Sequence, residues 1–378
     1  MATPTPGPLG ESIDDLGLVD HHVHGALRQS VDRATWESML TEAPTAPGVG
    51  SIFDSQVGIA IRRWCAPLLD LPVHAPGEAY WARRCELGES EVTRRLLTAS
   101  GTGTWLVETG YLGDAVLGPA EMAKISGTSR EIVRLETVAE DLLATRGVDA
   151  FLADYPAVLA ETVAARDAVG TKSVMAYRSG FDTAPERPST AQVQAGADAA
   201  LGVGDRPRIG DPALLRHLQW CGVDLGLPLQ LHSGYGDPDL DLDRADPTLL
   251  MGWLRLVEPT GVPIMLLHNY PFHRQAGYLA QVFDNVYFDV GLGINYTGAA
   301  SRQVIAESFE LAPFYKQLYS SDAWGPAELH LLGARLWRRG VAAVLGEWVA
   351  DGDWSAADAE RVAALVAREN AERVYALT

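Results

Sequence analysis

Two histidines near the start of the chain have the spacing of a metal-binding pair. His22 and His24 flank Val23 and follow Asp20. Side chains two residues apart on a strand point to the same side, so both imidazoles can reach one cation, while His21 and Val23 face away. An H-x-H pair alone is weak evidence, and it needs partners from elsewhere in the chain.

Three further polar residues each close a separate apolar run: His232, His268 and Asp322. In parallel barrels the carboxyl ends of the strands form the face where catalytic side chains gather. A buried His or Asp needs a polar partner, and one metal ion would satisfy all of these groups together. For each residue taken singly, a hydrogen-bonded core position is the commoner explanation. The set as a whole predicts a metal site.

Imidazole nitrogens and a carboxylate form a borderline ligand set that suits one divalent metal. Zn²⁺ fits best, with Mn²⁺, Fe²⁺ or Co²⁺ as alternatives. Such a metal lowers the pKa of bound water, which can then act as a nucleophile near neutral pH. We expect His268 to act as an acid/base group or to stabilise an oxyanion. Asp322 is expected to ligate the metal and to take the proton of the attacking water.

Apolar runs that alternate with helical stretches must position these groups. Runs of this length separated by helices indicate βα units and a parallel sheet, and eight of them favour a closed (β/α)8 TIM barrel of the α/β class over an open sheet. The expected strands are residues 18–22, 104–109, 132–136, 173–177, 227–232, 263–268, 285–290 and 317–322.

The rest of the chain departs from this alternation at both ends. Residues 27–101 are too long for a simple connection, and we interpret them as a helical insertion after the first strand, either a lid or a dimer-forming surface. Residues 1–14 are expected to be a disordered tail, and residues 15–378 one barrel domain. The C-terminal part is expected to be helical, with Ser355 as a helix N-cap.

Several sequence blocks resemble the amidohydrolase superfamily, and in particular the amidohydrolase domain of FluG-like and nodulin/glutamine-synthetase-like fusion proteins. The first is the D-x-H-x-H motif from Asp20 to His24. The others lie in the same order along the chain: Arg134–Thr137, Lys172–Gly180, Leu231–Leu242, His268–Arg274, Tyr287–Leu292 and Ser320–Ala323.

The resemblance implies a metal held by His22, His24, His232 and Asp322, with His268 close by. Some members of the superfamily hold two metals bridged by a modified lysine on the fourth strand. Lys172 is the candidate here, but it precedes the expected strand 173–177 and should lie at the opposite end of the barrel, which favours one metal. The partnership with glutamine synthetase in the related fusions suggests a γ-glutamyl amide as substrate.

Three residues near the expected barrel mouth are candidates for substrate binding. Arg178 follows the fourth apolar run, and its guanidinium could clamp a carboxylate, although a salt bridge to Glu136 or Glu108 is an equally ordinary role. Glu136 could contact substrate or orient a ligand histidine. His273 follows Pro271 near the mouth.

The composition limits the classes of partner. A formal net charge of −19 disfavours nucleic acids and anionic membranes. Three cysteines without metal-type spacing, and the lack of a signal peptide or of an apolar run long enough to span a membrane, indicate a cytoplasmic protein. We expect a small-molecule substrate and allow for a homo-oligomer.

Two further readings stay open beside C–N bond hydrolysis. The same mononuclear site could carry out non-oxidative decarboxylation of a small carboxylic acid. The site could also be a non-catalytic metal scaffold, although the presence of both ligand and acid/base positions makes this the least favoured reading.

Overall fold

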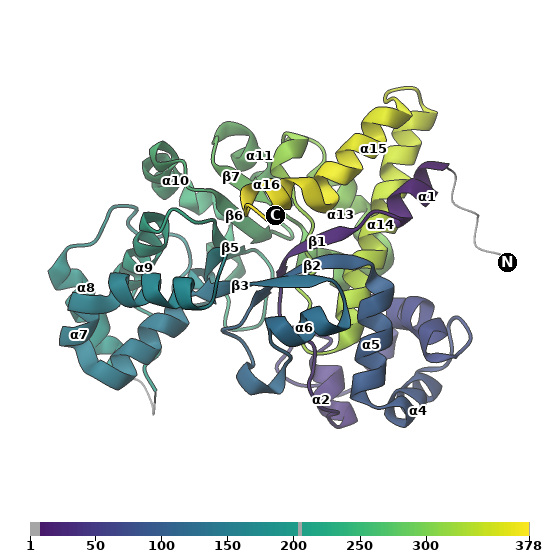
Figure 1. Ribbon diagram of the computed structural model, residues 1–378, viewed down its shortest axis with the longest axis horizontal. Coiled ribbons are helices and arrows are strands. Elements are labelled where there is room, and N and C mark those ends of the chain that lie inside the picture. The colour runs from purple at the N-terminus through teal and green to yellow at the C-terminus, as the bar shows by residue number, and fades with distance from the viewer. Residues whose placement is uncertain (1–7, 203–205, 378) are drawn as a thin grey trace.

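The computed structural model describes residues 8–202 and 206–377 (Figure 1). Its centre is a parallel sheet of seven strands that pair in sequence order, which is the architecture of a TIM-barrel-like α/β protein. The strands are β1 (Leu18–Val23), β2 (Thr102–Glu108), β3 (Thr128–Arg134), β4 (Gly170–Ser173), β5 (Leu229–Ser233), β6 (Ile264–His268) and β7 (Val286–Phe288).

The predicted eighth strand, residues 317–322, is not a regular strand. It forms one isolated bridge to β7, yet its backbone bonds to both neighbours. The Leu318 N–H donates to the carbonyl of Phe288 in β7 (3.0 Å), and the Asp322 N–H donates to that of His22 in β1 (3.1 Å). The segment therefore takes the eighth position and links the two edges of the sheet.

A side chain explains why this segment forms no ladder. The Asp20 carboxylate accepts both the Ser321 N–H (3.0 Å) and the Ser321 Oγ–H (2.5 Å). A backbone group captured by a side chain is lost to strand pairing. These two bonds also hold Ser321 in place, and Ser321 directly precedes Asp322, the residue that the sequence predicts to be a metal ligand.

The fourth strand starts three residues and ends four residues earlier than expected. β4 ends at Ser173, and residues 175–177 form a 3₁₀ turn rather than a strand. The run from Val174 to Ala176 is buried, so its apolar character reflects burial and not strand pairing. Lys172 consequently lies at the carboxyl end of β4. The expected strand 173–177 would have put residues after Ser173 at that end.

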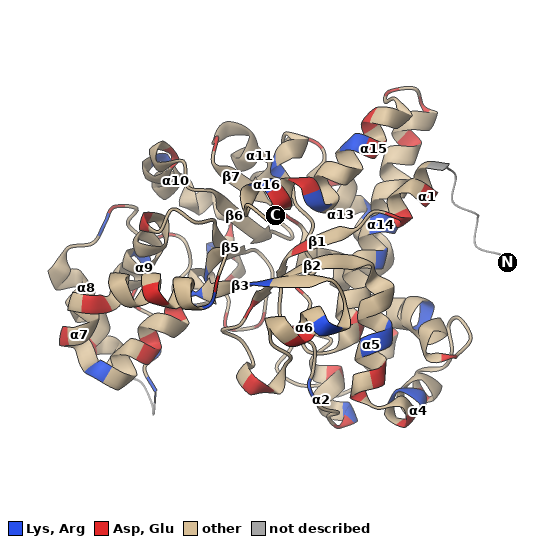
Figure 2. Ribbon diagram, viewed as in Figure 1, with Lys and Arg blue, Asp and Glu red and all other residues tan. Residues whose placement is uncertain are grey.

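Helices surround the sheet, with α7 (Leu135–Ala165), α8 (Thr190–Leu201) and α9 (Pro212–Asp224) packed together on one side and α4 (Gly77–Leu87) and α5 (Glu89–Ser100) on another (Figure 1). Acidic and basic residues lie along these outer helices (Figure 2). After β2 the helices are α6 (Pro119–Ile125), α7 (Leu135–Ala165), α8 (Thr190–Leu201), α9 (Pro212–Asp224), α10 (Met251–Val257), α11 (His273–Val282), α12 (Gly291–Thr297), α13 (Ser301–Ser308), α14 (Ala327–Ala350), α15 (Ala356–Ala364) and α16 (Asn370–Val374). No helix within the described residues is long and apolar enough to cross a membrane.

The chain between β1 and β2 contains α2 (Arg33–Ser38), α3 (Gln56–Ala60), α4 (Gly77–Leu87) and α5 (Glu89–Ser100), with residues 39–51 forming neither helix nor strand. Its aromatic side chains pack inward: Trp36 and Tyr80 are fully buried, with ring centroids 6.2 Å apart. Trp36 and Tyr80 therefore cannot contribute to an exposed aromatic dimer interface.

A buried ion cluster attaches this region to the barrel. Arg84 in α4 makes a two-pronged pair with Glu89 of α5 (2.7 and 2.8 Å) and donates from Nε to Glu328 of α14 (2.8 Å). Tyr80 also donates to Glu328 (2.9 Å). All of these side chains are buried, so α4 and α5 are fixed to α14 through charged contacts that water does not reach.

Both ends of the described chain are helical. The expectation of a disordered tail over residues 1–14 is wrong for its second half, because Pro8–Asp14 forms α1, which packs against α14 and buries Ile13 completely. Proline is favoured at a helix start, since its missing N–H would have had no partner there. Residues 1–7 lie outside the described part. Ser355 caps α15 by accepting the Asp358 N–H, as predicted.

Candidate active site

The two N-terminal histidines lie side by side at the carboxyl end of β1. Both are buried, and their ring centroids are 5.2 Å apart. The Nδ1 atom of His22 lies 2.7 Å from Gln230 Oε1, and that of His24 lies 3.1 Å from the carbonyl oxygen of Glu108. Each ring is thus held from outside through the nitrogen that faces away from the cavity.

The bond to Gln230 fixes the tautomer of His22. Gln230 Nε2 donates to the His21 carbonyl (2.7 Å) and to the Tyr375 hydroxyl (2.8 Å), so Oε1 must be the acceptor for His22. His22 therefore carries its hydrogen on Nδ1, and its Nε2 lone pair faces the centre of the cluster, where Lys172 Nζ lies 3.2 Å and Asp322 Oδ1 3.0 Å away. An outer hydrogen bond of this kind is what orients a metal-ligating imidazole.

His268 and Asp322 complete a compact donor group with His22. Ligand atoms from these three residues all lie within 4.8 Å of one another, and His268 Nε2 is 3.3 Å from Asp322 Oδ2. Both residues have left-handed backbones, with φ values of 67° and 48°. That conformation is uncommon for residues other than glycine and concentrates at functional sites.

His24 and His232 flank this group. His24 Nε2 is 3.7 Å from Asp322 Oδ1. His232 donates from Nε2 to the Tyr235 carbonyl (3.1 Å), which leaves its Nδ1 lone pair free, and its ring lies 4.7 Å from that of His268. The compact group thus contains two of the four residues that the resemblance implies as ligands, His22 and Asp322, together with His268, while His24 and His232 lie at its edge.

The donor set fits a divalent metal. Both ring nitrogens of His268 are buried without a hydrogen-bond partner, a costly state for a polar group. Burial lowers the pKa of His22, His232 and His268 well below the usual histidine value and that of His24 to about 4. Neutral imidazoles with inward lone pairs beside one carboxylate are a typical ligand set for Zn²⁺ or a similar ion.

The prediction that Lys172 lies at the opposite end of the barrel is wrong. Its Nζ atom is 3.2 Å from His22 Nε2, and the side chain is buried. The early end of β4 causes the error, because Lys172 is the penultimate residue of the strand and not the residue before it. Burial lowers the pKa of Lys172 to about 8. Because Lys172 lies beside His22, its position does not favour one metal over two.

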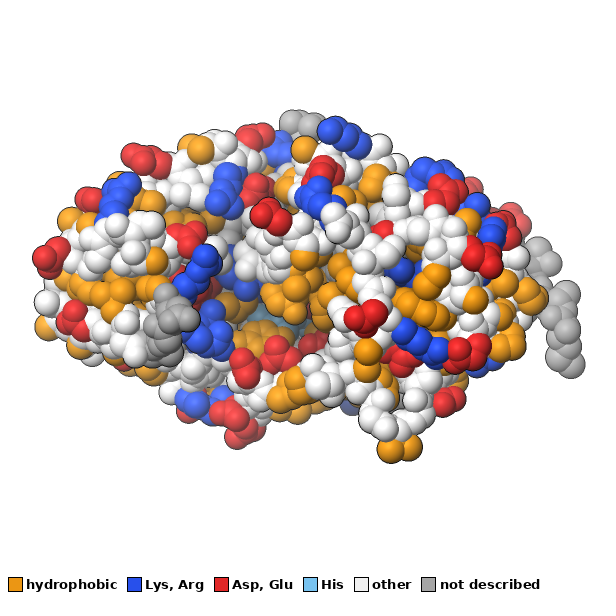
Figure 3. All heavy atoms as spheres, turned by 90° about the horizontal axis from the view of Figure 1, so that it is seen from below, with side chains coloured by type: hydrophobic (Ala, Val, Ile, Leu, Met, Phe, Trp, Pro, Cys, Tyr) orange, Lys and Arg blue, Asp and Glu red, His pale blue; other side chains and the backbone are white. Residues whose placement is uncertain are grey.

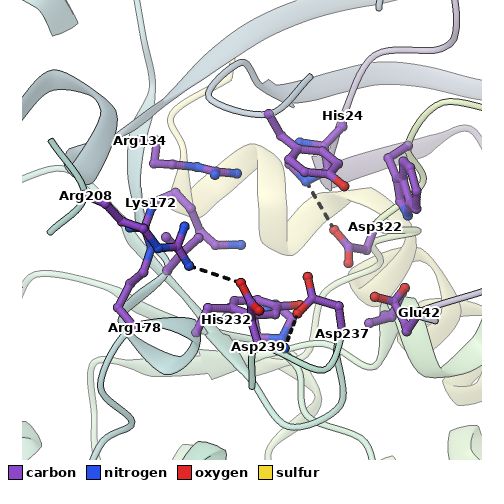
Figure 4. A pocket seen from close by; sticks show the side chains of 15 residues that line it. His24, Glu42, Arg134, Lys172, Arg178, Arg208, His232, Asp237, Asp239 and Asp322 are labelled. Atoms are coloured by element: carbon purple, nitrogen blue, oxygen red, sulfur yellow. Dashed lines mark hydrogen bonds and ion pairs between the residues drawn. The ribbon is translucent and has the colours of Figure 1, made fainter. Parts of the chain in front are cut away.

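The cavity over the cluster has a volume of about 320 Å³, within the range of small-molecule sites. Figure 3 looks into this hollow, where a histidine is visible at the bottom, and Figure 4 shows the side chains around it. The lining residues include His24, Lys172, His232 and Asp322 of the centre, and around them Glu42, Arg134, Arg178, Arg208, Asp237 and Asp239.

Of the three predicted substrate-binding residues, one lines the cavity and two do not. Arg178 lies on its wall and is held by Glu140 (3.2 Å), not by Glu136 or Glu108. Glu136 is fully buried beneath β4, where it accepts from Ser173 Oγ (2.7 Å). His273 at the start of α11 bonds to Glu307 (2.6 Å). Glu136 and His273 therefore have hydrogen-bond partners within the protein and do not line the cavity.

Several residues of the wall were not identified from the sequence, among them Arg134 and Glu42. Arg134 closes β3 and pairs with Glu108 (2.5 Å), which itself lies 3.3 Å from His24 Nδ1. The rule that identified Asp322, a polar residue ending an apolar run, applies equally to Arg134. Glu42 comes from the irregular segment 39–51, whose lack of periodicity gives no sequence signal of where it folds. Its carboxylate points into the cavity (Figure 4), and burial raises its pKa to about 7.

Known proteins similar to this chain share its fold and part of its sequence. The family model described as Amidohydrolase matches residues 148–377. Protein fluG of Emericella nidulans is 31% identical over 246 residues, which are 61% of this chain but only 28% of fluG. A Lactobacillus casei structure described as a metal-dependent hydrolase is 25% identical with a TM-score of 0.81, covering 98% of both chains. A uronate isomerase from Bacillus halodurans, 12% identical with a TM-score of 0.65 and covering 98% of this chain and 96% of its own, shares the fold.

Proposed function

The chain belongs to the amidohydrolase family, and from that premise we propose that it is a metal-dependent hydrolase that cleaves a C–N bond in a small amide. The observation that carries the proposal is the buried convergence of His22, His268 and Asp322, with ligand atoms within 4.8 Å of one another. His24 and His232 would supply further donors to the same ion. Zn²⁺ is the ion that this set suits best.

When bound, the metal would act as a Lewis acid and lower the pKa of a coordinated water. Asp322 has one carboxylate oxygen near His22 and the other near His268, so it can accept a proton from the attacking water and pass it to the leaving amine. If His24 and His232 complete the ligand set with His22 and Asp322, His268 is left free to donate to a developing oxyanion. The Lys172 ammonium adds positive charge beside His22, which favours the same negatively charged transition state.

The metal centre is tested by elemental analysis of the purified protein. Wild type is expected to hold a divalent metal that the double variant His22→Ala/His24→Ala has lost, while a fold check by circular dichroism shows that both are intact. Unchanged metal content in the double variant contradicts the proposed centre. On an identified substrate, Asp322→Asn is expected to lose most of the turnover, and full turnover would remove the proton-transfer role from Asp322.

A second reaction, non-oxidative decarboxylation of a small carboxylic acid, is favoured by one observation: Arg134, Lys172, Arg178 and Arg208 give the cavity a cationic side that suits a carboxylate. Turnover in ¹⁸O water separates the two reactions. Hydrolysis places the label in the carboxylic acid product. Decarboxylation releases CO₂ and places a solvent hydrogen on carbon.

A further inference from the structure

A second cavity lies in the outer layer of the protein, between α1, α3 and α14. Its volume is about 730 Å³, within the range of small-molecule sites. α1 and α14 lie beside each other in Figure 1 and are in contact. None of the residues that line this cavity also lines the cavity over the metal centre, so the reaction proposed above does not use it.

One face of α14 forms a long wall of this second cavity. Its residues recur with helical spacing: Arg335, Leu336, Arg339, Ala342, Ala343 and Gly346. Side chains three or four residues apart share one face of a helix. The last three are small, and a Cβ atom at Gly346 would meet nothing within 4 Å. The small side chains therefore leave open space along this face.

The other walls are largely apolar. Leu9 of α1, Ile59 and Ala60 of α3, and Trp64 line the cavity, and Ile59 is 47% exposed. Apolar surface that faces water is stabilised when an apolar ligand covers it. The shape and the lining therefore suit an aliphatic chain.

Three arginines add positive charge to this apolar lining. Arg63, Arg335 and Arg339 line the cavity, and none of the three forms an ion pair with a residue of the described chain. Arg335 gives one nitrogen to the Ala99 carbonyl (3.2 Å), and the Arg63 guanidinium lies 4.6 Å from the centre of the Trp64 ring. A guanidinium has five N–H donors, so all three arginines retain donors for a ligand.

The acidic residues nearby do not neutralise these arginines. Asp14 is the one acidic side chain among the described residues that line the cavity, and it has no ion pair with any of the three. Glu347, which follows Gly346, is paired with Arg302 instead. In a chain with a net charge of −19, this group of cations gives the cavity a local field that favours an anion.

We propose that the second cavity binds an amphipathic carboxylate, such as a medium-chain fatty acid, with its carboxylate at the arginines and its aliphatic tail along the small residues of α14. A guanidinium holds a carboxylate through two parallel hydrogen bonds, and each methylene group removed from water contributes about fourfold in affinity. A neutral apolar ligand leaves the arginines unused, and a compact anion leaves the apolar walls uncovered. This inference is independent of the proposed hydrolase function.

Three ligands separate the contributions of the head group and the tail in calorimetric titrations of the full chain. Decanoate has both parts, decanol lacks the charge, and hexanoate lacks four methylene groups. We expect decanoate to bind saturably with one site per chain, and each of the other two to bind at least about 10-fold more weakly. Equal binding of decanol overturns the inference, as does the lack of saturable binding of decanoate.

Two variants locate the bound decanoate. Arg339→Gln removes one cation, and Gly346→Leu places a side chain in the open space on the same face of α14. Each should weaken decanoate binding by about 10-fold or more. Leucine favours a helix more than glycine does, so Gly346→Leu should keep its thermal stability. The matched control is Arg255→Gln on the exposed side of α10, which should bind like wild type. Unchanged affinity in both test variants puts decanoate elsewhere, the metal centre included, and overturns the inference.

Sedimentation velocity without ligand tests a different occupant, a second copy of the chain. We expect wild type, Arg339→Gln and Gly346→Leu to have the same sedimentation coefficient. A wild-type dimer that both variants dissociate would assign the cavity to a second copy, and the proposal of a fatty-acid site would be wrong.

Discussion

Replacing Gln230 by leucine should weaken metal binding without removing a metal ligand. Gln230 Oε1 accepts the Nδ1 hydrogen of His22 at 2.7 Å inside a fully buried pocket. Without that acceptor, a metal-bound His22 keeps an unpartnered buried N–H. The metal-free ring escapes this cost by moving its hydrogen to Nε2, where Asp322 Oδ1 lies 3.0 Å away. The substitution therefore stabilises the free state relative to the bound state.

The expected loss of metal affinity is about 10- to 100-fold, which corresponds to about 1.4–2.8 kcal/mol. The assay is competition with a chromogenic chelator, with thermal unfolding measured in parallel. The fold will also lose stability, because the His21 carbonyl and the Tyr375 hydroxyl lose their donor, at about 1–3 kcal/mol for each buried group left without a partner.

Tyr375→Phe is the matched control for this prediction. It removes the hydroxyl that accepts from Gln230 Nε2 (2.8 Å) and contacts His21 Nδ1 (3.1 Å), but it leaves the bond between Gln230 Oε1 and His22 intact. Metal affinity in this variant should stay within about threefold of wild type. The reasoning is refuted if Gln230→Leu binds metal as tightly as wild type, or if both variants lose the same affinity.

Three other predictions address stability and accessibility. Arg84→Met should lower the free energy of unfolding by about 3–5 kcal/mol, because the buried carboxylates of Glu89 and Glu328 lose their cation. Arg94→Met, at the exposed pair with Glu91, should cost less than about 1 kcal/mol in the same denaturant titrations. Comparable losses in the two variants would count against a structural role for the buried Arg84 cluster. Burial raises the pKa of Glu42 from 4.5 to about 7, so the folded metal-free protein binds the Glu42 proton more tightly than the unfolded chain does. The stability of wild type relative to Glu42→Gln should therefore fall as pH rises from 4.5 to 7. A difference in melting temperature between the two proteins that does not vary with pH argues against the shift. Iodoacetamide should modify exposed Cys85 in the native protein and should reach Cys65 and Cys221 only after unfolding, as measured by mass spectrometry. Burial raises the pKa of Cys221 to about 12. Fast labelling of Cys221 in the native protein would contradict its burial.

Local sequence pattern predicts the strands well where an apolar run and a strand coincide. β1, β5 and β6 end within a residue of the expected positions, so the histidines they carry were placed correctly. The pattern fails at β4, because a buried 3₁₀ turn has the same apolar composition as a strand, and this error displaced Lys172. The eighth strand was expected from its composition, but a side chain of β1 captures the N–H that a ladder would need.

The walls of the cavity were harder to predict than its floor. Glu136 was expected at the mouth because the third strand was placed two residues too late; β3 ends at Arg134, and Glu136 lies inside α7. Glu42 lies in a segment without periodicity, and only the packing of the segment against distant strands brings it to the site. Spacing within one element can be read from the sequence, whereas contacts between an irregular segment and a barrel depend on the whole fold.

The irregular segment 39–51 has a consequence for how this protein can change. It contributes no strand to the sheet and no helix to the outer layer, while α4 and α5 beside it are fixed to α14 by the Arg84 cluster. Glu42 on the cavity wall and the residues of the candidate metal centre therefore lie on parts of the chain that are held in different ways. Replacement of these thirteen or so residues by a segment of different charge is a direct route to altered selectivity, by laboratory evolution or by design, with the metal centre left untouched.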